Sequence, residues 1–408
     1  MSFSFVFFMA GLIILIGFLG SVSFEKTKIP DVLVLLGIGI LLGPIIKLID
    51  PRDFYHFTEY FGAFALMVIL FDGGMDTGIE RLIKEFGYAV LLVTLSFGLT
   101  VGAVYVLLYF LMGWNTLNSL LLATILGCTS AAIIIPVTGS MSLKPEIKTL
   151  LSLESTLSDV FAVLIAISLL QFIKLENIGI EQPMRHIASS FSIAIVVGIA
   201  AGFFWLKVLD LFKGEKYTYM ITLAAILIMY SVDEFLGGSG PIAVLIFGVI
   251  LGNGHAIVKF FKLNIKSSLD ETLKFFHGEV TFIIRTFFFV YLGMILSPDF
   301  IKPEMLYVSG LITLIILVIR YISVEVMGIV DGKKKKDKNI LLFMIPRGLA
   351  TAVLATIPSA TKIQGCEYFT EYAFGVIVMT NILMTIGVYY TEIGKVKTGN
   401  NKKAGSNK

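Results

Sequence analysis

The sequence predicts an all-α, polytopic membrane protein with thirteen transmembrane helices, built as inverted repeats that each contain one discontinuous helix. Three observations predict this class. The chain has 408 residues, of which 57% are hydrophobic and only 15% are charged, and a soluble domain of this length would not tolerate that composition. Apolar runs recur along the whole chain. Two of them, at corresponding places in the two halves, are interrupted by proline and glycine.

The predicted spans are apolar runs of about the length that crosses a membrane, which is roughly 20 residues for a helix. Numbered in chain order, they lie near 3–20, 29–50, 60–76, 87–112, 116–140, 150–173, 187–206, 218–236, 240–253, 276–296, 304–330, 339–361 and 370–390.

The basic residues orient the predicted spans. Of the 32 lysines and arginines, 23 fall in the loops after odd-numbered spans or in the tail, including five between 333 and 338, against six in the other loops. Cytoplasmic loops carry an excess of Lys and Arg. We therefore expect a multi-pass protein of the cell membrane with its amino end outside. Residues 391–408 are polar, and we expect a disordered cytoplasmic tail there.

An internal similarity indicates the repeats. Span two reads PDVLVLLGIGILLG and span nine reads PIAVLIFGVILG, so that Gly39 and Gly43 can be laid on Gly248 and Gly252. An odd separation of seven spans gives the two segments opposite directions, as an inverted repeat requires. Glycines four apart also occur wherever helices pack closely, which is the alternative.

The predicted organisation follows from these repeats. We expect a single transmembrane unit over 1–390, with repeat one at about 1–173, a connector helix at about 187–206 and repeat two at about 218–390. Inverted repeats belong mainly to secondary transporters and channels. This organisation therefore favours transport.

Spans five and twelve hold corresponding places and are both interrupted. Span five contains GCTSAAIIIPV, and span twelve contains MIPRGLATAVLATIP. Proline and glycine inside a membrane helix free backbone groups that protein, water or a bound ion must satisfy. Such paired interruptions indicate a binding site at the middle of the membrane, although a proline kink alone would give the same pattern in either span.

Span six carries two acids in an apolar helix, Glu154 and Asp159, within LSLESTLSDVFAV. An acid inside a membrane is costly and is by default a hypothesis of function. We expect Arg347 to neutralise Glu154. Asp159 is then left to bind a cation or a proton, with the hydroxyls of Ser155 and Thr129 as further oxygen ligands, which alkali cations prefer. The alternative is that Asp159 pairs with a basic residue as a structural contact.

Two further charged residues complete the candidate site. Asp72, in LFDGGMD at the end of span three, is expected to join the ion-binding residues at a water-filled entrance to the site, with an ordinary interfacial acid as the alternative. Arg320, alone in ILVIRYIS of span eleven, is expected to stabilise the core around the broken helices, with an arginine that reaches the membrane surface as the alternative.

These motifs resemble those of the monovalent cation:proton antiporters, in particular the NhaP-like sodium/proton exchangers, over essentially all thirteen spans. FDGGMD resembles the family's Phe-Glu-Gly-Gly segment, and ESTLSD resembles its Gly-Glu-Ser-x-x-Asn-Asp signature. GGSGPIAVLIFG, the lone Arg320 and PRGLATAV resemble later segments, with Arg347 on the arginine that pairs with the first acid. The resemblance implies a six-helix core domain with two crossed discontinuous helices, a dimerisation domain and alternating access.

The sequence departs from the family pattern at two positions. The family's Thr-Asp-Pro is here Thr129, Ser130 and Ala131, and its Asn-Asp pair is Ser158 and Asp159. Ser158 therefore joins the expected ion-binding residues in place of an amide. GCTSAAI is similar to the potassium-efflux branch, but the nucleotide-binding domain usual there is absent and the chain has no GxGxxG motif.

The expected function is exchange of Na+ or Li+ for H+, with Asp159 as the shared site of an electroneutral cycle. The alternatives are K+/H+ exchange and, less favoured, a cation channel. We find no nucleophile and base pair and no metal-ligand spacing in the sequence, so we expect no enzyme and no cofactor. The expected partners are the lipid bilayer, the transported Na+ at Asp159, Ser155 and Thr129, the proton, and a second copy of the chain as homodimer, with no nucleic acid.

Overall fold

The computed structural model describes residues 3–27, 31–46, 55–76, 78–139, 141, 143–174, 181–212, 215, 217–260, 271–295, 302–330, 332 and 338–405. Over these residues the regular structure is helical. The lysine cluster at 333–337 and the two amino-terminal residues lie outside the described part. The orientation of the chain across the membrane therefore stays a prediction.

The chain divides into two compact units. Unit one comprises 1–55, 87–162 and 289–408, and unit two comprises 56–86 and 163–288. The helices of the first half are α1 (Phe3–Thr27), α2 (Asp31–Ile40), α3 (Tyr55–Asp76), α4 (Ile79–Val106), α5 (Thr116–Gly127), α6 (Ala131–Gly139) and α7 (Pro145–Lys174). Short π-helical segments, η1 (Leu41–Ile45) and η3 (Leu107–Leu111), extend α2 and α4.

The second half continues with helices throughout. They are α8 (Glu181–Leu211), α9 (Thr218–Phe235), α10 (Gly240–Gly252), α11 (Gly254–Phe260), α12 (Glu271–Ile295), α13 (Pro303–Val330), α14 (Lys338–Phe343), α15 (Leu349–Ala360) and α16 (Phe369–Gly405). Each predicted span contains a helix or a pair of helices. Six helices in the described part are long and apolar enough to cross a membrane, so the total of thirteen stays a prediction.

The conformation of the carboxyl-terminal tail differs from the predicted one. α16 continues as helix to Gly405, whereas the sequence predicts disorder from residue 391. Extending a helix that already exists costs far less than starting one, because each added residue gains a hydrogen bond without a new nucleus. The packed part of α16 supplies that nucleus, so low hydrophobicity alone did not predict the conformation of the tail.

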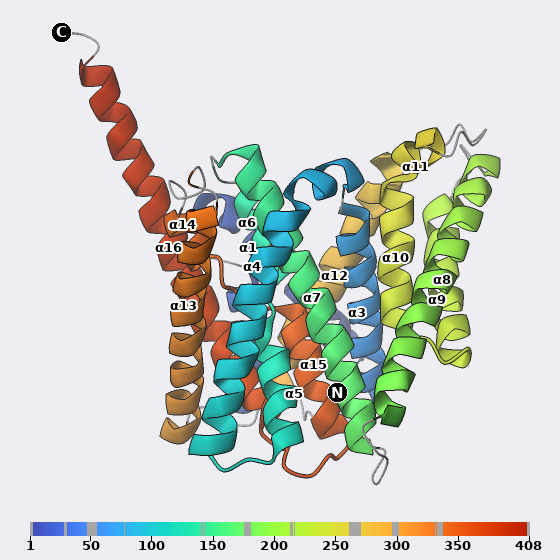
Figure 1. Cartoon of the computed structure of the whole chain (residues 1–408), viewed down its shortest axis with the longest axis horizontal. Helices are drawn as coiled ribbons and strands as arrows, with labels where there is room; N and C mark the ends of the chain where they lie inside the picture. Colours follow the sequence, from blue (N-terminus) through green and yellow to red (C-terminus); the bar gives the residue numbers. More distant parts are fainter. Residues whose placement is uncertain are drawn as a thin grey trace. The chain divides into compact units, whose positions relative to one another are not determined.

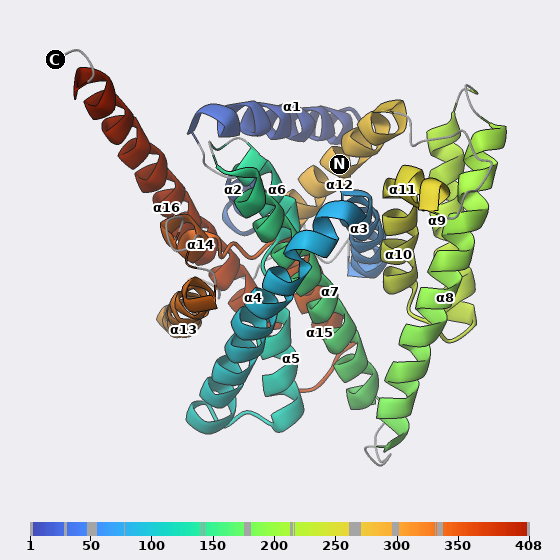
Figure 2. The ribbon, with the colours of Figure 1, turned by 45° about the horizontal axis from the view of Figure 1, so that its top comes forward.

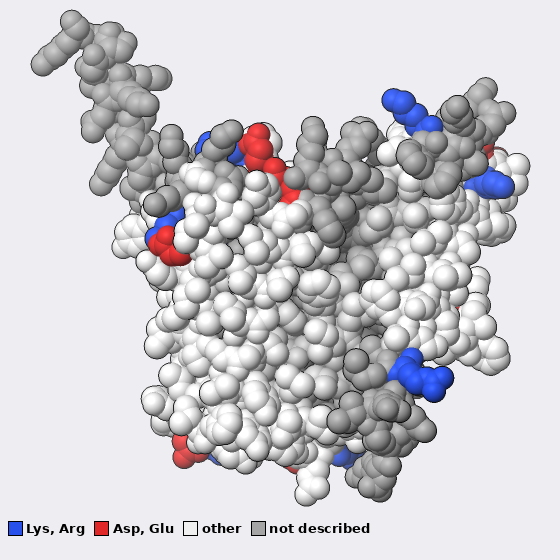
Figure 3. Space-filling model, viewed as in Figure 1, with Lys and Arg blue, Asp and Glu red and all other residues white. Residues whose placement is uncertain are grey.

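Unit one surrounds the two interrupted helices. In Figures 1 and 2, α13, α14 and α16 lie side by side, and α15 lies against α5. Apolar side chains of α5, α15 and α16 fill the centre, among them Leu122, Ile125, Leu354 and Ile377, each almost fully buried. Over α13 and α4, the face in Figure 3 shows charged side chains near the helix ends and a band without them between. That band is what a bilayer requires.

Unit two is a bundle centred on α10. In both ribbon views α8, α9 and α10 lie side by side. Gly198 and Gly202 of α8 face Ile246 and Ile250 of α10, so the branched side chains fill the space that the glycines leave. Small residues of this kind let membrane helices approach closely.

The glycines of the internal similarity pack in the same way in both units. In unit one, a Cβ at Gly39 would overlap the carbonyl oxygen of Val290 on α12. In unit two, a Cβ at Gly248 would overlap the carbonyl oxygen of Phe71 on α3. The span-two and span-nine segments thus each press a glycine face against a neighbouring helix backbone, which supports the predicted repeat.

We expect Gly248→Ala to destabilise the protein, because backbone atoms cannot move aside as a side chain end can. Overpacking of this kind costs roughly 1 to 3 kcal/mol. Thermal unfolding in detergent measures the loss. Gly102→Ala is the matched control, since no atom lies within 4 Å of a Cβ there and alanine favours helix. Equal unfolding midpoints for the two variants would contradict the close packing.

Candidate ion site at the two helix breaks

The two interrupted helices meet at their breaks. Helix α5 ends at Gly127, α6 begins at Ala131, and the backbone between them is extended at Cys128. The second break lies between α14 and α15, and the carbonyl of Pro346 there accepts from the backbone N–H of Ser130 in the first break, at 2.8 Å. A side chain at Gly348 would collide with the hydroxyl of Ser130, so glycine is required where the breaks cross. The predicted pair of discontinuous helices is confirmed.

Proline explains the second break. Pro346 has no N–H and disfavours the helical conformation for the residue before it. The freed groups find partners on α16: the hydroxyl of Thr380 accepts from the N–H of Arg347 at 3.1 Å, and Asn381 Nδ2 donates to the carbonyl of Arg347 at 2.8 Å. Both α16 residues are fully buried. These two residues are not among the predicted site residues, although their polarity within an apolar span marks them in the sequence.

The side chain of Arg347 is hydrogen-bonded to the backbone at the first break. Its guanidinium donates to the carbonyls of Leu126 at 2.9 Å and Gly127 at 3.2 Å, and to its own neighbour Ile345 at 2.9 Å. These carbonyls at the end of α5 lack helical partners and carry the negative end of the helix dipole. Arg347 therefore bridges the two breaks, and the predicted Glu154–Arg347 ion pair is wrong.

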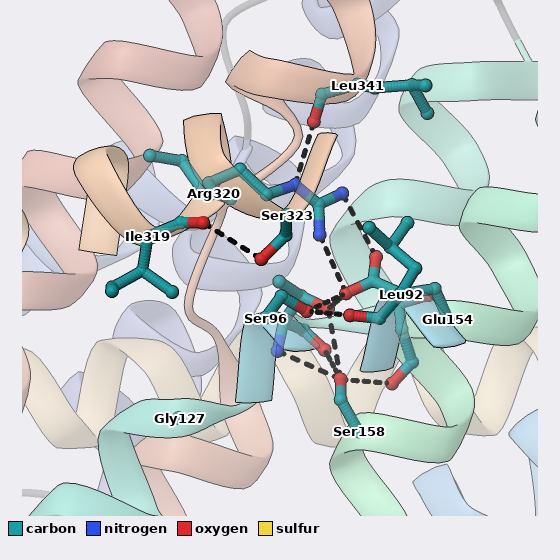
Figure 4. Close-up of polar contacts among 12 residues, drawn as sticks. Leu92, Ser96, Gly127, Glu154, Ser158, Ile319, Arg320, Ser323 and Leu341 are labelled. Atoms are coloured by element: carbon teal, nitrogen blue, oxygen red, sulfur yellow. Dashed lines mark hydrogen bonds and ion pairs between the residues drawn. The ribbon is translucent and has the colours of Figure 1, made fainter. Parts of the chain in front are cut away.

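Glu154 pairs with Arg320 instead. Nη1 lies 2.9 Å from Oε1 and Nη2 lies 3.2 Å from Oε2, a two-pronged geometry that suits the planar guanidinium. Both side chains are buried. Nε of Arg320 also donates to the carbonyl of Leu341 on α14, at 2.8 Å. Figure 4 shows the guanidinium between that carbonyl and the carboxylate. One arginine thus joins α13, α7 and the first half of the second broken helix.

Hydroxyl groups complete the surroundings of Glu154. Its Oε1 accepts from the hydroxyls of Thr129 at 3.2 Å and Ser96 at 3.4 Å. The hydroxyl of Ser158 lies 3.0 Å from that of Thr129 and accepts from the Thr129 N–H, also at 3.0 Å. Glu154 is therefore paired with a buried cation and hydrogen-bonded to two hydroxyl groups.

Asp159 has a different environment. It is 6% exposed, and its Oδ2 accepts from the N–H of Ala131 at the start of α6, at 3.1 Å. A helix N-terminus favours a negative charge. Within the described part of the chain, Oδ1 has no hydrogen-bond partner. A buried acceptor without a partner is rare and costly, and a cation or a proton would satisfy it.

The predicted oxygen ligands are not gathered on Asp159. Ser155 donates its hydroxyl to the carbonyl of Ser152 at 3.0 Å. The hydroxyl of Thr129 bonds Glu154 and Ser158. Spacing along a helix places residues on a face but does not fix their rotamers. The structure thus brings Thr129, Ser158 and Glu154 together, with Asp159 beside them on α7.

Two residues near Asp159 were not predicted. The thiol of Cys128 interacts with the Asp159 carboxylate and lies 3.4 Å from the hydroxyl of Thr351 on α15. Both side chains are buried. Thr351 follows the second break by one turn, in PRGLATAV. That position, beside a break, could have marked it as a candidate.

Asp72 lies in unit two. Its carboxylate is 3.4 Å from Nε2 of His277 on α12, and its side chain is 40% exposed. The sequence does not predict this pair, because residues about two hundred positions apart show no spacing from which a pair could be read. The ion-binding role predicted for Asp72 stays a prediction.

Fold and site together define a helical membrane protein in which two interrupted helices meet beside a buried, incompletely bonded carboxylate. The model of the family described as sodium/hydrogen exchanger, transmembrane, matches residues 11–390. The chain belongs to this family.

Two relatives each match most of this chain, and they are named for different ions. The K+/H+ antiporter NhaP2 of Shewanella oneidensis is 26% identical over 387 residues, which cover 92% of this chain and 64% of that protein. The chain thus spans less than two thirds of that relative. The Na+/H+ antiporter 1 of Methanocaldococcus jannaschii is 26% identical over 390 residues, 92% of this chain and 88% of that protein.

A solved structure has the same fold. The sodium proton antiporter MjNhaP1 from Methanocaldococcus jannaschii superposes with a TM-score of 0.79 at 23% sequence identity, covering 96% of this chain and 98% of that one. The predicted resemblance and the all-helical fold class are confirmed.

Proposed function

We propose that the protein exchanges a monovalent cation for protons across the cell membrane by alternating access, with Na+ as the cation and Li+ as a further substrate. The observation that carries this proposal is Oδ1 of Asp159, which is buried beside the two helix breaks without a partner. A carboxylate in that position takes either a proton or a cation, because each satisfies the same oxygen. Competition for one group couples the two ions.

The surrounding charges support a cycle without net charge transfer. Arg320 neutralises Glu154, and Ser130 stands where the family has an aspartate, so one titratable carboxylate remains at the breaks. Cation binding in one half-cycle and proton binding in the other then move the same charge in opposite directions. The hydroxyls of Ser155, Thr129 and Ser158 would have to turn towards Asp159 to serve as ligands when the cation is bound.

K+/H+ exchange is the second candidate. Two observations favour it: a relative named as a K+/H+ antiporter matches 92% of this chain, and the serine at position 130 removes a charged oxygen from the break. A site with fewer charged oxygen ligands attracts a small cation such as Na+ less strongly than a site with more of them, which weakens the preference for Na+ over K+. A channel would share the oxygen-lined site but would need no competition with protons. The expected homodimer stays a prediction.

Purified protein in liposomes tests the exchange directly. An outward gradient of Na+, Li+ or K+ in turn should drive protons inward and acidify the lumen, as reported by a trapped dye. Protein-free liposomes control for leakage. Cation flux without proton movement would overturn the proposal in favour of a channel, and a response to K+ with none to Na+ would favour the second candidate.

A further inference from the structure

Unit two contains a second buried carboxylate without a partner, that of Asp233. The residue lies in the last turn of α9 and has no exposed surface. Within the described part of the chain, neither of its two carboxylate oxygens has a hydrogen-bond partner. The last turn of α9 also contains no basic residue. Buried carboxylates are normally paired or bound to a metal ion, because an isolated charge away from water is costly.

The turn between α9 and α10 is built around this carboxylate. In Figure 1 the turn lies at the end of α10 that is away from α11. A Cβ at Gly238 would collide with both carboxylate oxygens of Asp233, so the carboxylate lies against the bare backbone of that glycine. The carbonyl of Gly237 accepts from the hydroxyl of Ser190 on α8, at 2.7 Å. Helix α8 therefore holds the turn in place without using Asp233.

The charged groups described at this turn are negative. Glu234 follows Asp233, and its Oε1 accepts from the N–H of Gly240 at the start of α10, at 2.8 Å. That helix N-terminus favours a carboxylate at Glu234, whose charge repels the charge of Asp233. The end of α9 adds the negative end of its helix dipole. Two acids therefore meet at a place that favours a cation.

A metal ion satisfies this arrangement better than a proton does. A proton binds one oxygen of Asp233 and leaves the other without a partner, whereas a metal ion can bind both oxygens of one carboxylate. The hydroxyl of Ser239 is a further oxygen ligand within reach of the turn, because it forms no capping bond to α10. The carbonyl groups of the turn are others, since each carbonyl oxygen has two lone pairs.

The ligand types indicate which metal ion fits. The described residues contain no cluster of three acidic, histidine or cysteine side chains, so most ligands at the turn must be neutral oxygens. Ca2+ accepts six to eight oxygen ligands, including carbonyls, hydroxyls and two-pronged carboxylates, in flexible geometry. Its double charge also matches the two acids. Mg2+ requires a stricter octahedron and keeps several waters, for which a sealed carboxylate offers less room.

We propose that the turn between α9 and α10 is a Ca2+ site, with Asp233 as its central ligand, Glu234 as a second charge and neutral oxygens of the turn completing it. The bound ion stabilises the α8, α9 and α10 bundle. This site is separate from the proposed exchange of ions at Asp159 and does not depend on it.

Calcium binding is measured by equilibrium dialysis on the full protein in detergent, after a chelator has removed metal ions. We expect about one Ca2+ per chain with a dissociation constant of about 10⁻⁴ to 10⁻³ M, the range of weak sites, which have few charged ligands. Asp233→Asn keeps the shape and removes the charge, so it should weaken binding about tenfold or more. Glu234→Gln should weaken it less, since that side chain is exposed.

Two variants control for the position of the ion. Asp210→Asn removes another acid from the last turn of a unit-two helix, α8, and should bind Ca2+ as the wild type does. Asp159→Asn should also bind Ca2+ normally. Equal binding by Asp233→Asn and the wild type, or a wild type that binds no Ca2+, would overturn the site. A wild type that binds Ca2+ through Asp233 but exchanges no ions would refute only the proposed function.

Thermal unfolding provides an independent measurement. Ca2+ should raise the unfolding midpoint of the wild type in a concentration-dependent way, because a ligand that binds the folded state stabilises it. Asp233→Asn should be at least as stable as the wild type without Ca2+, since it removes an unpaired buried charge, and should gain nothing from Ca2+. An equal gain in both proteins would contradict the site.

Terbium luminescence tests the location without changing an acid. Tb3+ binds at oxygen sites suited to Ca2+ and emits when a nearby aromatic ring is excited. The ring of Tyr230 packs against Gly240 at the turn, so Tyr230→Phe should lower the emission of bound Tb3+ while the affinity for Ca2+ stays the same. Unchanged emission would place the ion elsewhere and overturn the proposal, even if Asp233→Asn does not fold.

Discussion

Asp159→Asn is expected to reduce cation-driven proton movement to the level of protein-free liposomes while leaving the protein folded. The amide has nearly the same shape, and its oxygen can still accept from the N–H of Ala131, as Oδ2 of Asp159 does at 3.1 Å. It cannot release a proton or carry a negative charge. The variant therefore can no longer exchange a proton for a cation at this position, but it keeps the local hydrogen bond.

Asp210→Asn is the control variant, because it removes a carboxylate at the end of α8, in unit two. That variant should exchange at the wild-type rate, and the two variants should have similar unfolding midpoints. Persistent exchange by Asp159→Asn would mean that another group accepts the proton. Asp72 and Glu154, the remaining acids of the predicted site, would then be the candidates for that group.

Arg320→Ala is expected to cause the largest loss of stability. Removing one member of a buried ion pair leaves the other charged and unpaired, which costs roughly 3 to 5 kcal/mol. Here the loss also frees the carbonyl of Leu341. Glu154→Ala should destabilise the protein comparably. The double variant Glu154→Ala with Arg320→Ala should recover part of the loss, since neither charge is left alone.

Glu154→Ala combined with Arg347→Ala is the matched control. Arg347 donates to carbonyls and not to Glu154, so the two losses of unfolding free energy should add within about 0.5 kcal/mol. Thermal and denaturant unfolding in detergent measure both cycles. The opposite pattern would contradict the pairing in the structure. In that pattern the losses of unfolding free energy add for Glu154→Ala with Arg320→Ala, and part of the loss is recovered for Glu154→Ala with Arg347→Ala, as the sequence predicts.

The sequence predicts the helices well because the membrane imposes a strong rule. Backbone groups in lipid must be satisfied within the helix, so long apolar runs become helices and Gly127, Pro346 and Gly348 mark where helices stop. The glycines of spans two and nine also predict close packing correctly. These features depend on local composition, which a single sequence contains.

The partners inside the site depend on three-dimensional placement, and there the sequence is less informative. Arg320 and Arg347 are both lone cations in apolar spans, and only the fold shows that one faces Glu154 while the other faces freed carbonyls. The rotamer of Ser155, which turns to its own helix, is likewise invisible in a pattern. The pair of Asp72 and His277 joins positions about two hundred residues apart, beyond the reach of any spacing rule.

The central claim is that one carboxylate, Asp159, binds a cation or a proton but not both, and proton release on cation binding tests it most directly. Na+ is added to the purified protein in weakly buffered detergent solution, at a pH where the site is protonated, and the released protons are counted with an indicator dye. We expect about one proton per bound Na+, an apparent affinity that weakens about tenfold per unit of acidification, and neither binding nor release in Asp159→Asn. Saturable Na+ binding without proton release, or release that persists in Asp159→Asn, would contradict the account.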